Sequence, residues 1–393
     1  MPHRGLPMSL VLILAVLAGI SVANLYYCQP LLNLICQDTG LSEFQVNLMP
    51  VFTQVGYALG LLFILPMGDL YNRRVTVLVS FFAVVLALVA VFFSRHTFTL
   101  LAASFVTGFF SVSPQVFIPF VSLYAKPEMK EQKVGIVLSG LLIGVLASRV
   151  LSGYVGHLWG WRSMYLIAAA IMSASALVIL CVFPRVEPVY KGSYVSLMLS
   201  LGKLISRRAL FHSVRAGLAF GSMLGLWACI AFHMKSAPFY ADSDTVALLA
   251  LCGVAGALTA ANVGKLIPRH GHERINIIGT CLVILAWLTL WFFGDSYAGM
   301  IAGIIIIDIG MQCIQLSNQN AVMNLNPQAS SRMNTIYMVI YFACGSMGTF
   351  VCGTMWTVAG WKGTVCAGLA LIIASATVSL SAGNGQYDTE SAF

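Results

Sequence analysis

One acidic residue, Asp308, lies deep within an apolar segment of the chain. An aspartate at the centre of a membrane helix costs about 2.5–3.5 kcal/mol, so its position indicates either a function or a partner. Gln312, Gln315 and Gln319 follow it at spacings of four, seven and eleven residues, which places all four side chains on one face of a helix. We interpret Asp308 as a proton-coupling or substrate-binding carboxylate, because burial in hydrocarbon favours the protonated form. The alternative is a structural partner for Arg149.

Arg149 is the other charge deep within an apolar segment. It either contacts an anionic group of a substrate or fixes the packing of helices. A tight pair with Asp308 would hold that aspartate ionised and oppose simple proton coupling. Arg215 lies only five residues inside its segment, so we expect its long side chain to reach the cytoplasmic interface.

The first apolar segment carries Asn24, Tyr26, Tyr27 and Gln29 directly before Pro30. A proline inside a membrane helix bends it and frees backbone acceptors, as transporter sites often require. The two tyrosines either stack on a flat substrate or lie in the aromatic belt at the outer membrane surface.

A second polar stripe, formed by Ser104, Gly108, Ser111 and Gln115, has the same helical spacing as the stripe that begins at Asp308. A polar stripe is costly in lipid, so each stripe is expected to face a polar path or another helix. Trp227 either lines this path or packs in the core. The candidate substrate-binding residues are Asn24, Tyr26, Tyr27, Gln29, Ser111, Gln115, Arg149, Trp227, Gln312, Gln315 and Gln319.

The composition is that of a lipid-embedded protein. Of 393 residues, 59% are hydrophobic and only 9% are charged, whereas soluble domains carry about 25% charged residues. The ten cysteines form no CxxC pair, so we expect neither a metal nor a cofactor and interpret the cysteines as free, buried thiols. No Walker loop or G-x-S-x-G turn is present, so the chain is not expected to be an enzyme or an ATP-driven pump.

Twelve candidate membrane spans of about 20 mainly apolar residues can be counted. They cover 8–36, 45–66, 75–94, 98–124, 134–157, 163–183, 210–234, 245–264, 275–293, 298–323, 333–357 and 363–382. With both termini in the cytoplasm, fifteen lysines and arginines lie in inner segments and four in outer loops. This bias follows the positive-inside rule, and it explains the net charge of +8 without a nucleic-acid partner.

Sequence features recur at an offset of 200 residues. Pro327 follows Pro127 at this offset, Gln315 follows Gln115, and the triplet Gly-Trp-Lys at 360–362 follows Gly-Trp-Arg at 160–162. Parallel repeats of this kind are a known transporter architecture. We therefore predict an all-α membrane protein whose twelve helices form two pseudo-symmetric six-helix bundles.

The predicted domains are an N-terminal bundle (1–183), a cytoplasmic linker (184–209), a C-terminal bundle (210–382) and a cytoplasmic tail (383–393). Apolar residues recur at helical spacing within the linker, between serines and lysine. This pattern predicts a short amphipathic helix on the membrane surface.

The segment 65–74 resembles the loop signature G-x-x-x-D-R-x-G-R-R/K of the major facilitator superfamily. Asp69, Arg73 and Arg74 match it, whereas leucines replace its first glycine and first arginine. Asn72 replaces the second glycine, and asparagine tolerates a left-handed turn. The resemblance implies that Asp69, Arg73 and Arg74 act as a conformational latch.

The segments 23–32, 113–115 and 308–312 look like those of a bacterial branch that resembles exporters of purine nucleosides, sugars and drugs. The resemblance covers essentially the whole chain. It implies a monomer in the bacterial inner membrane, with spans one, four, seven and ten around a central cavity. One departure is that 144–149 lacks the glycine-proline signature of drug/proton antiporters, which argues against a simple transfer of that role.

Together these features predict a secondary active transporter that exports a small amphipathic or nucleoside-like solute, coupled to protons, by alternating access. One alternative is a facilitator or importer of a small metabolite, with Arg149 reading an anionic group. Another is a membrane receptor or scaffold that does not transport. The expected partners are a small-molecule substrate, protons and the lipid bilayer.

Overall fold

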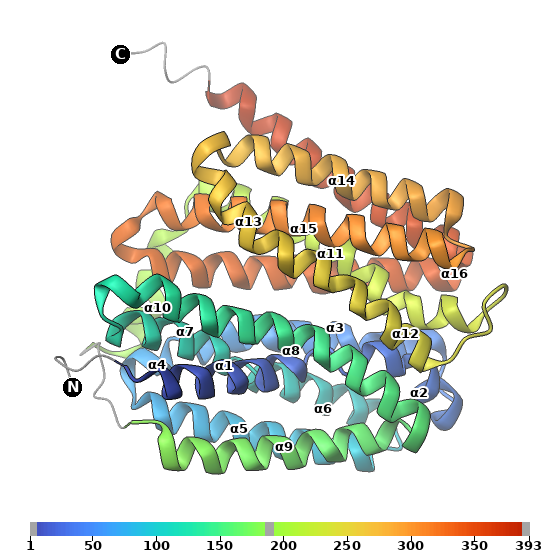
Figure 1. Cartoon of the computed structure of the whole chain (residues 1–393), viewed down its shortest axis with the longest axis horizontal. Coiled ribbons are helices and arrows are strands. Elements are labelled where there is room, and N and C mark those ends of the chain that lie inside the picture. Colours follow the sequence, from blue (N-terminus) through green and yellow to red (C-terminus); the bar gives the residue numbers. More distant parts are fainter. Residues whose placement is uncertain (1–5, 185–191, 387–393) are drawn as a thin grey trace. The chain divides into compact units, whose positions relative to one another are not determined.

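The computed structural model describes residues 6–184 and 192–386, and within these ranges it contains helices and no strand (Figure 1). The beginning of the predicted linker (185–191) and the end of the predicted tail (387–393) lie outside the described residues. The chain divides into two compact units. Unit 1 comprises the chain up to Ser200 together with Ala241–Ala250, and unit 2 comprises Leu201–Tyr240 together with the chain from Leu251.

Unit 1 is built from helices that precede the linker, with one short helix from later in the chain. These are α1 (Met8–Ala23), η1 (Gln29–Leu31), α2 (Leu32–Thr39), α3 (Glu43–Phe63), α4 (Met67–Leu70), α5 (Arg73–Phe93), α6 (Thr97–Phe110), α7 (Ser113–Tyr124), η2 (Pro127–Met129), α8 (Lys130–Trp159), α9 (Trp161–Val182) and α12 (Ser243–Ala250). Within it α1 packs on α8, α3 on α6, α5 on α9 and α12 on α8.

Unit 2 contains the later spans. Its helices are α11 (Arg207–Lys235), η3 (Leu251–Gly253), α13 (Val254–His270), α14 (His272–Phe293), α15 (Tyr297–Leu325), η4 (Pro327–Ala329) and α16 (Ser330–Gln386). Here α11 packs on α16, and α15 packs on α11, α13 and α14. The predicted linker helix is present as α10 (Tyr194–Leu204), and the boundary between the two units falls within it.

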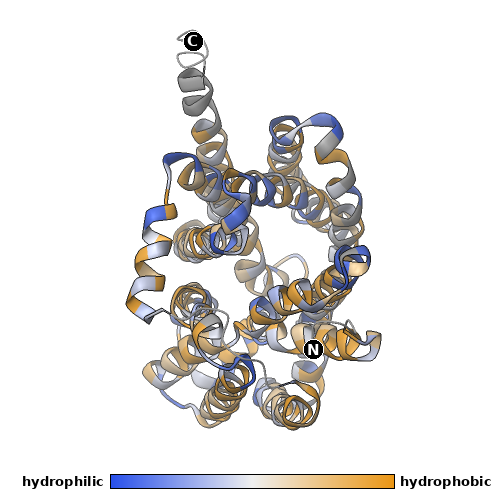
Figure 2. Ribbon diagram, turned by 90° about the vertical axis from the view of Figure 1, so that its left-hand side faces the viewer, coloured by the Kyte–Doolittle hydropathy of each residue, from blue (hydrophilic) through white to orange (hydrophobic). Residues whose placement is uncertain are grey.

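Ten helical stretches in the described residues are long and apolar enough to cross a membrane. One of them, Pro327–Val378, contains two of the predicted spans, and the first predicted span is represented by the shorter helix α1. These observations are consistent with twelve spans and confirm the all-α membrane class. Large apolar side chains such as Phe82 (64% exposed) and Val16 (61% exposed) point away from the protein. Figure 2 shows how widely hydrophobic residues cover the helices, as a lipid-facing surface requires.

Several predicted spans are interrupted rather than continuous. The first breaks between Ala23 and Leu32, the fourth between Phe110 and Ser113, and the eighth at η3. In the first break, Pro30 stands at the beginning of η1, as its missing N–H predicts. Interrupted helices are tolerated in membranes where protein buries the freed backbone groups, and transporters use them to build binding sites.

The 200-residue repeat is confirmed in local geometry. Gly160 and Gly360 both have positive φ, at +79° and +58°, where a residue with a side chain would be strained. At Gly360 this conformation separates the two spans that form α16. The following tryptophans each donate an indole hydrogen bond, Trp161 to the Asp38 carboxylate and Trp361 to the Leu290 carbonyl.

The two units also share a very close helix pair at an equivalent place. A Cβ atom added to Gly144 on α8 would lie 2.3 Å from the backbone of Gly19 on α1. A Cβ atom added to Gly348 on α16 would lie 2.3 Å from the backbone of Gly221 on α11. Small residues permit this close approach of membrane helices. The first and fifth helices of each repeat therefore pack backbone to backbone.

The cysteines are free thiols, as predicted, but they are not uniformly buried. Cys28, Cys229, Cys313 and Cys352 are buried, whereas Cys181, Cys281 and Cys366 are exposed on the helices. The sequence pattern missed this difference because a lipid-facing position and a core position are equally apolar.

Candidate functional site

The interrupted first span forms a buried polar segment in unit 1. Between α1 and α2, the side chains of Asn24, Tyr26, Tyr27 and Gln29 are all buried, with exposures of 7% or less. A belt residue would lie exposed at the membrane surface. The aromatic-belt interpretation of the two tyrosines is therefore wrong, and both rings lie inside the bundle.

Arg149 of α8 reaches this segment from the neighbouring helix. Its side chain is 4% exposed, and its Nε donates a hydrogen bond to Gln29 Oε1 at 2.8 Å. Its guanidinium carbon lies 5.0 Å from the centre of the Tyr26 ring, within range of a cation–π interaction. The arginine thus joins α8 to the broken span through one amide and one aromatic ring.

Sequence analysis missed Tyr57 of α3, which belongs to the same region. The Tyr57 side chain is 1% exposed, hydrogen-bonds with the Gln115 side chain and interacts electrostatically with Tyr26. Asn47, Gln54 and Tyr57 recur at spacings of seven and three residues and are all buried. This helical spacing was the signal that could have revealed a polar face on the second span.

The predicted stripe on the fourth span is divided between two roles. The hydroxyls of Ser104 and Ser111 donate to the carbonyls of Leu100 and Thr107 on their own helix, at 2.8 and 2.6 Å. A Cβ atom added to Gly108 would lie 1.9 Å from the carbonyl oxygen of Thr53 on α3. The stripe therefore meets another helix at Gly108, whereas its last member, Gln115, points to the Tyr57 hydroxyl.

In unit 2, Asp308 of α15 lies inside the bundle. Asp308 is 8% exposed, so its carboxylate does not face lipid. The Asp308 Cβ atom lies 3.1 Å from the place where a Cβ of Gly256 on α13 would stand. The interruption η3 comes directly before α13 and also contacts α15. A buried carboxylate beside an interrupted span is an arrangement that transporters use for coupling ions.

The three glutamines that follow Asp308 are partly buried. Gln319 Nε2 donates to Asn334 Oδ1 on α16 at 2.8 Å, and the backbone carbonyl of Gln315 accepts from the Tyr337 hydroxyl at 3.1 Å. Part of this stripe therefore packs against α16. Trp227 of α11 is fully buried, which favours core packing over a place in a cavity wall.

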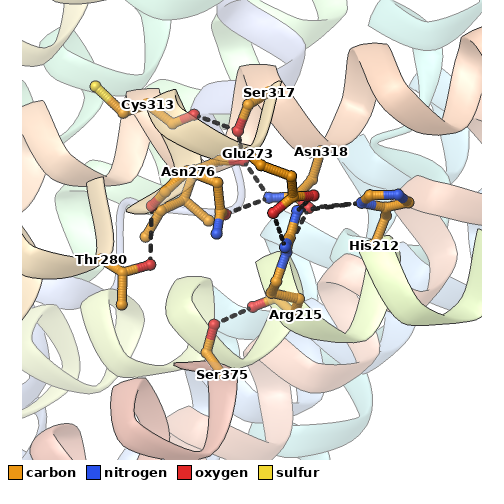
Figure 3. Close-up of polar contacts among 10 residues, drawn as sticks. His212, Arg215, Glu273, Asn276, Thr280, Cys313, Ser317, Asn318 and Ser375 are labelled. Atoms are coloured by element: carbon orange, nitrogen blue, oxygen red, sulfur yellow. Dashed lines mark hydrogen bonds and ion pairs between the residues drawn. The ribbon is translucent and has the colours of Figure 1, made fainter. Parts of the chain in front are cut away.

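Arg215 is buried, whereas a side chain that extends to the interface is expected to expose its guanidinium. The residue is 1% exposed, and its Nη1 and Nη2 donate to the two carboxylate oxygens of Glu273 at 2.7 and 3.0 Å (Figure 3). Its Nε donates to Asn318 Oδ1 at 2.8 Å, and Asn318 Nδ2 donates in turn to Asn276 Oδ1 at 2.8 Å. The guanidinium stays buried because the Asn318 amide and the Glu273 carboxylate together accept its hydrogen bonds.

Figure 3 also shows His212 beside Asn318 and Arg215, with its Nδ1 3.1 Å from Asn318 Oδ1 and 3.2 Å from Arg215 Nη2. The network joins α11, α14 and α15. Glu273 is the second residue of α14, which begins three residues before the predicted span 275–293.

The predicted latch lies around α4 and the beginning of α5. The Asp69 side chain lies outside the described residues. Arg73 is buried and its Nε donates to the Gly68 carbonyl at 3.1 Å, and Arg74 Nη2 donates to the Leu180 carbonyl on α9. Asn72 has φ −60° and caps α5, accepting from the Arg74 N–H. It therefore replaces glycine as a helix cap and not as a left-handed residue.

Comparisons with known proteins agree with this architecture. The family model of the Major Facilitator Superfamily matches residues 11–351. The uncharacterized transporter YgaY of Escherichia coli O157:H7 is 30% identical over 384 residues, which cover 96% of each chain.

Two solved structures share the fold at low sequence identity. A crystal structure of a bacterial homolog of the human lysosomal transporter Spinster is similar with a TM-score of 0.73 and 17% identity, over 94% of this chain and 92% of the other. A crystal structure of the nucleoside transporter NupG is similar with a TM-score of 0.72 and 12% identity, over 95% and 98%.

Proposed function

This chain belongs to the major facilitator superfamily of membrane transporters, and from that premise we propose that it is a secondary active transporter that couples the export of a small amphipathic or nucleoside-like solute to protons. The superfamily handles small molecules in a lipid bilayer and is not enzymatic. Transport would proceed by alternating access, in which the substrate site opens first to one side of the membrane and then to the other.

The observation that carries the proton-coupling proposal is the position of Asp308. A carboxylate that is 8% exposed in the middle of a span needs either a proton or hydrogen-bonding partners to be stable there. Proton uptake and release at this group would link the protonation state to the conformational cycle. The adjacent interruption at η3 supports a role in the cycle, because a broken helix moves more readily than a continuous one.

The substrate proposal rests on unit 1. Asn24, Gln29 and Gln115 supply amides, and Tyr26 and Tyr27 supply aromatic rings, within the same buried region. Amides and aromatic rings together suit a solute with a flat face and a polar edge. NupG is a nucleoside transporter, and a nucleoside is a solute with a flat base and a polar edge. The similarity of NupG to this chain concerns the fold alone.

Membrane placement follows from the charge pattern. The excess of lysine and arginine in the inner segments and the bacterial relatives support the bacterial inner membrane, with both termini in the cytoplasm. A monomer is proposed as the transporting species. Asp69, Arg73 and Arg74 are proposed as the conformational latch, and the bonds of the two arginines to carbonyls on α4 and α9 support that role.

The test is the flux of radiolabelled uridine, with ethidium as the amphipathic probe, into and out of proteoliposomes. The wild-type protein is expected to move a probe in response to a pH gradient. Asp308→Asn keeps the size and the hydrogen-bonding capacity of the side chain but cannot exchange a proton, so gradient-driven flux should be lost. Gradient-driven flux at the wild-type rate in this variant would remove Asp308 from the coupling role.

A second candidate function is facilitated transport or import of a small anionic metabolite. The observation that favours it is the buried charge of Arg149, which is 4% exposed. Counterflow without a pH gradient separates the two functions. Full counterflow that an added pH gradient does not change would indicate facilitation.

A further inference from the structure

Near the breaks in the first and fourth spans of unit 1, three buried polar atoms have no hydrogen-bond partner among the described residues. They are Gln29 Nε2, Asn24 Oδ1 and Ser113 Oγ. Gln29 is 0% exposed and Asn24 is 5% exposed, so bulk water does not reach their side chains freely. A buried polar atom without a partner loses its hydrogen bonds to water and gains none in the protein, which is destabilising. In native proteins such an atom often marks a place where another molecule binds.

The orientation of the Gln29 amide follows from its neighbour. The Nε–H group of Arg149 can only donate, so the atom 2.8 Å away must be the oxygen of Gln29. The amide nitrogen, Nε2, then points elsewhere and presents two N–H groups. Gln29 is therefore a hydrogen-bond donor that needs an acceptor.

The orientation of the Asn24 amide is opposite and equally constrained. Its nitrogen lies 3.1 Å from the carbonyl of Ser21 and 3.4 Å from that of Ile20, and a carbonyl oxygen can only accept. The same nitrogen lies 3.4 Å from Met172 Sδ. Asn24 Oδ1 is therefore a hydrogen-bond acceptor that needs a donor.

Donor and acceptor come from one interrupted segment. Asn24 and Gln29 are five residues apart, on either side of Tyr26 and Tyr27. The Ser21 hydroxyl donates to the Ser111 carbonyl at 3.2 Å, which ties this segment to the break in the fourth span, where the Ser113 hydroxyl lies. The region thus offers a donor, an acceptor, a hydroxyl and two aromatic rings.

We propose that this region binds the neutral lactam edge (N–H beside C=O) of a flat heterocycle, with Gln29 as the donor and Asn24 as the acceptor. Arg149 is a positioning residue: it holds the Gln29 oxygen and so turns the amide nitrogen towards the substrate. This inference rests on the proposed transport function and names the substrate chemistry of the same site.

The probe is uridine, whose base carries a lactam edge, and N3-methyluridine is the matched control, because the methyl group removes the N–H donor. The key variant is Gln29→Glu. A carboxylate is a stronger acceptor for Arg149 than an amide, so the fold should be kept, whereas the donor is lost. The measurement is the ligand-induced rise in melting temperature of the purified full chain in detergent, as a function of ligand concentration.

Uridine is expected to stabilise the wild type, and half-saturation should require at least about tenfold more uridine in Gln29→Glu. N3-methyluridine should be weaker than uridine by a similar factor in the wild type. Arg149→Lys keeps the charge but loses the directed Nε–H, so the preference for uridine over N3-methyluridine should shrink. A purely structural role of Arg149 would lower stability and leave that preference unchanged.

Equal half-saturation of Gln29→Glu and the wild type, or no stabilisation of the wild type by uridine, would overturn the inference. Stabilisation by benzoate that persists in Gln29→Glu would overturn it in favour of anion binding at Arg149. Failure of the transport function has a different signature: uridine would bind with the expected specificity, but a pH gradient would drive no uridine flux in proteoliposomes.

Discussion

At the scale of single residues, the two units treat their buried arginines in different ways. Arg215 uses Nε, Nη1 and Nη2 on Asn318 and Glu273, in a geometry that matches the planar guanidinium group. Arg149 directs its Nε at an amide and lays its guanidinium near an aromatic ring. The first arrangement is suited to holding helices together, and the second is suited to orienting a side chain in a site.

Replacing Arg215 with alanine is expected to lower the melting temperature of the purified protein, because Glu273 and Asn318 both lose their donor. Removing one partner of a fully buried ion pair costs about 3–5 kcal/mol of unfolding free energy. The loss here should be smaller, because the Glu273 side chain is 57% exposed. Glu273→Gln should cost less, because an amide oxygen still accepts one hydrogen bond. Thermal unfolding in detergent measures both effects.

The control for this prediction is the double variant Arg215→Ala with Glu273→Ala. If the two side chains stabilise the bundle as a pair, the double variant should lose less than the sum of the two single alanine variants. Strict additivity would show that the ion pair contributes nothing to stability.

A candidate site residue was predictable from the sequence where a single property, such as a charge in an apolar segment, identifies it. Asp308 and Arg149 were found because a charge in an apolar segment is costly wherever the helix packs. The Arg215–Glu273 pair was not found, because its partners are 58 residues apart and meet only through the packing of α11 and α14. Tyr57 was missed for a related reason: a buried tyrosine and a lipid-facing tyrosine look alike until the neighbouring helices are in place.

At the scale of elements, the interruptions decide where side chains point. The break at Pro30 was predictable, since proline removes a backbone donor in any context. The breaks near Ser111 and at η3 were not predicted, although Pro114 stands in the first turn of α7, directly after the first of them. Apolar periodicity predicts an amphipathic helix in the linker, and helix α10 lies in this segment with Leu197 and Leu201 buried.

Pro30→Ala is expected to extend helical structure through the first break, because alanine supplies the missing N–H and has the highest helix propensity. The Gln29 side chain would then leave the position where it meets Arg149. We expect uridine flux in proteoliposomes to fall several-fold, while the elution profile in detergent remains that of the wild type. Wild-type flux would show that the break does not position the site.

Gly108→Ala is expected to destabilise unit 1, because its Cβ atom would lie 1.9 Å from a carbonyl oxygen of α3 that cannot move aside. Overpacking of this kind typically costs about 1–3 kcal/mol, and more where backbone must shift. Gly135→Ala is the matched control, since a Cβ added there has no neighbour within 4 Å. Melting temperatures should fall for the first variant and stay level or rise for the second, and a similar fall in both would contradict the close packing of α3 and α6.

At the scale of the whole molecule, a different function is proposed for each of the two repeats. The halves share the turn geometry at Gly160 and Gly360 and the close pairing of their first and fifth helices. Both halves bury amides, tyrosines and at least one arginine, but only unit 2 contains the acidic residue Asp308 among its buried residues. On this account, one repeat recognises the solute and the other carries the proton.

The repeat, the helical class and the superfamily were predictable, because each depends on sequence patterns that extend over most of the chain. An error in the bounds of one span does not change them. The contacts of α12 were not predictable. α12 belongs to unit 1 by its contacts with α8, although the polar linker precedes it in the sequence. The Ser243 hydroxyl donates to the Gly153 carbonyl at 3.0 Å and marks this contact, which no periodicity encodes.

Proton movement that depends on solute transport is the most direct measure of the central claim. Proteoliposomes that contain a trapped pH-sensitive dye would report proton flux when an outward or inward gradient of uridine is imposed. The account predicts proton movement with the wild type and none with Asp308→Asn, although uridine counterflow continues in that variant. Uridine-driven proton movement of equal size in both proteins would contradict the account.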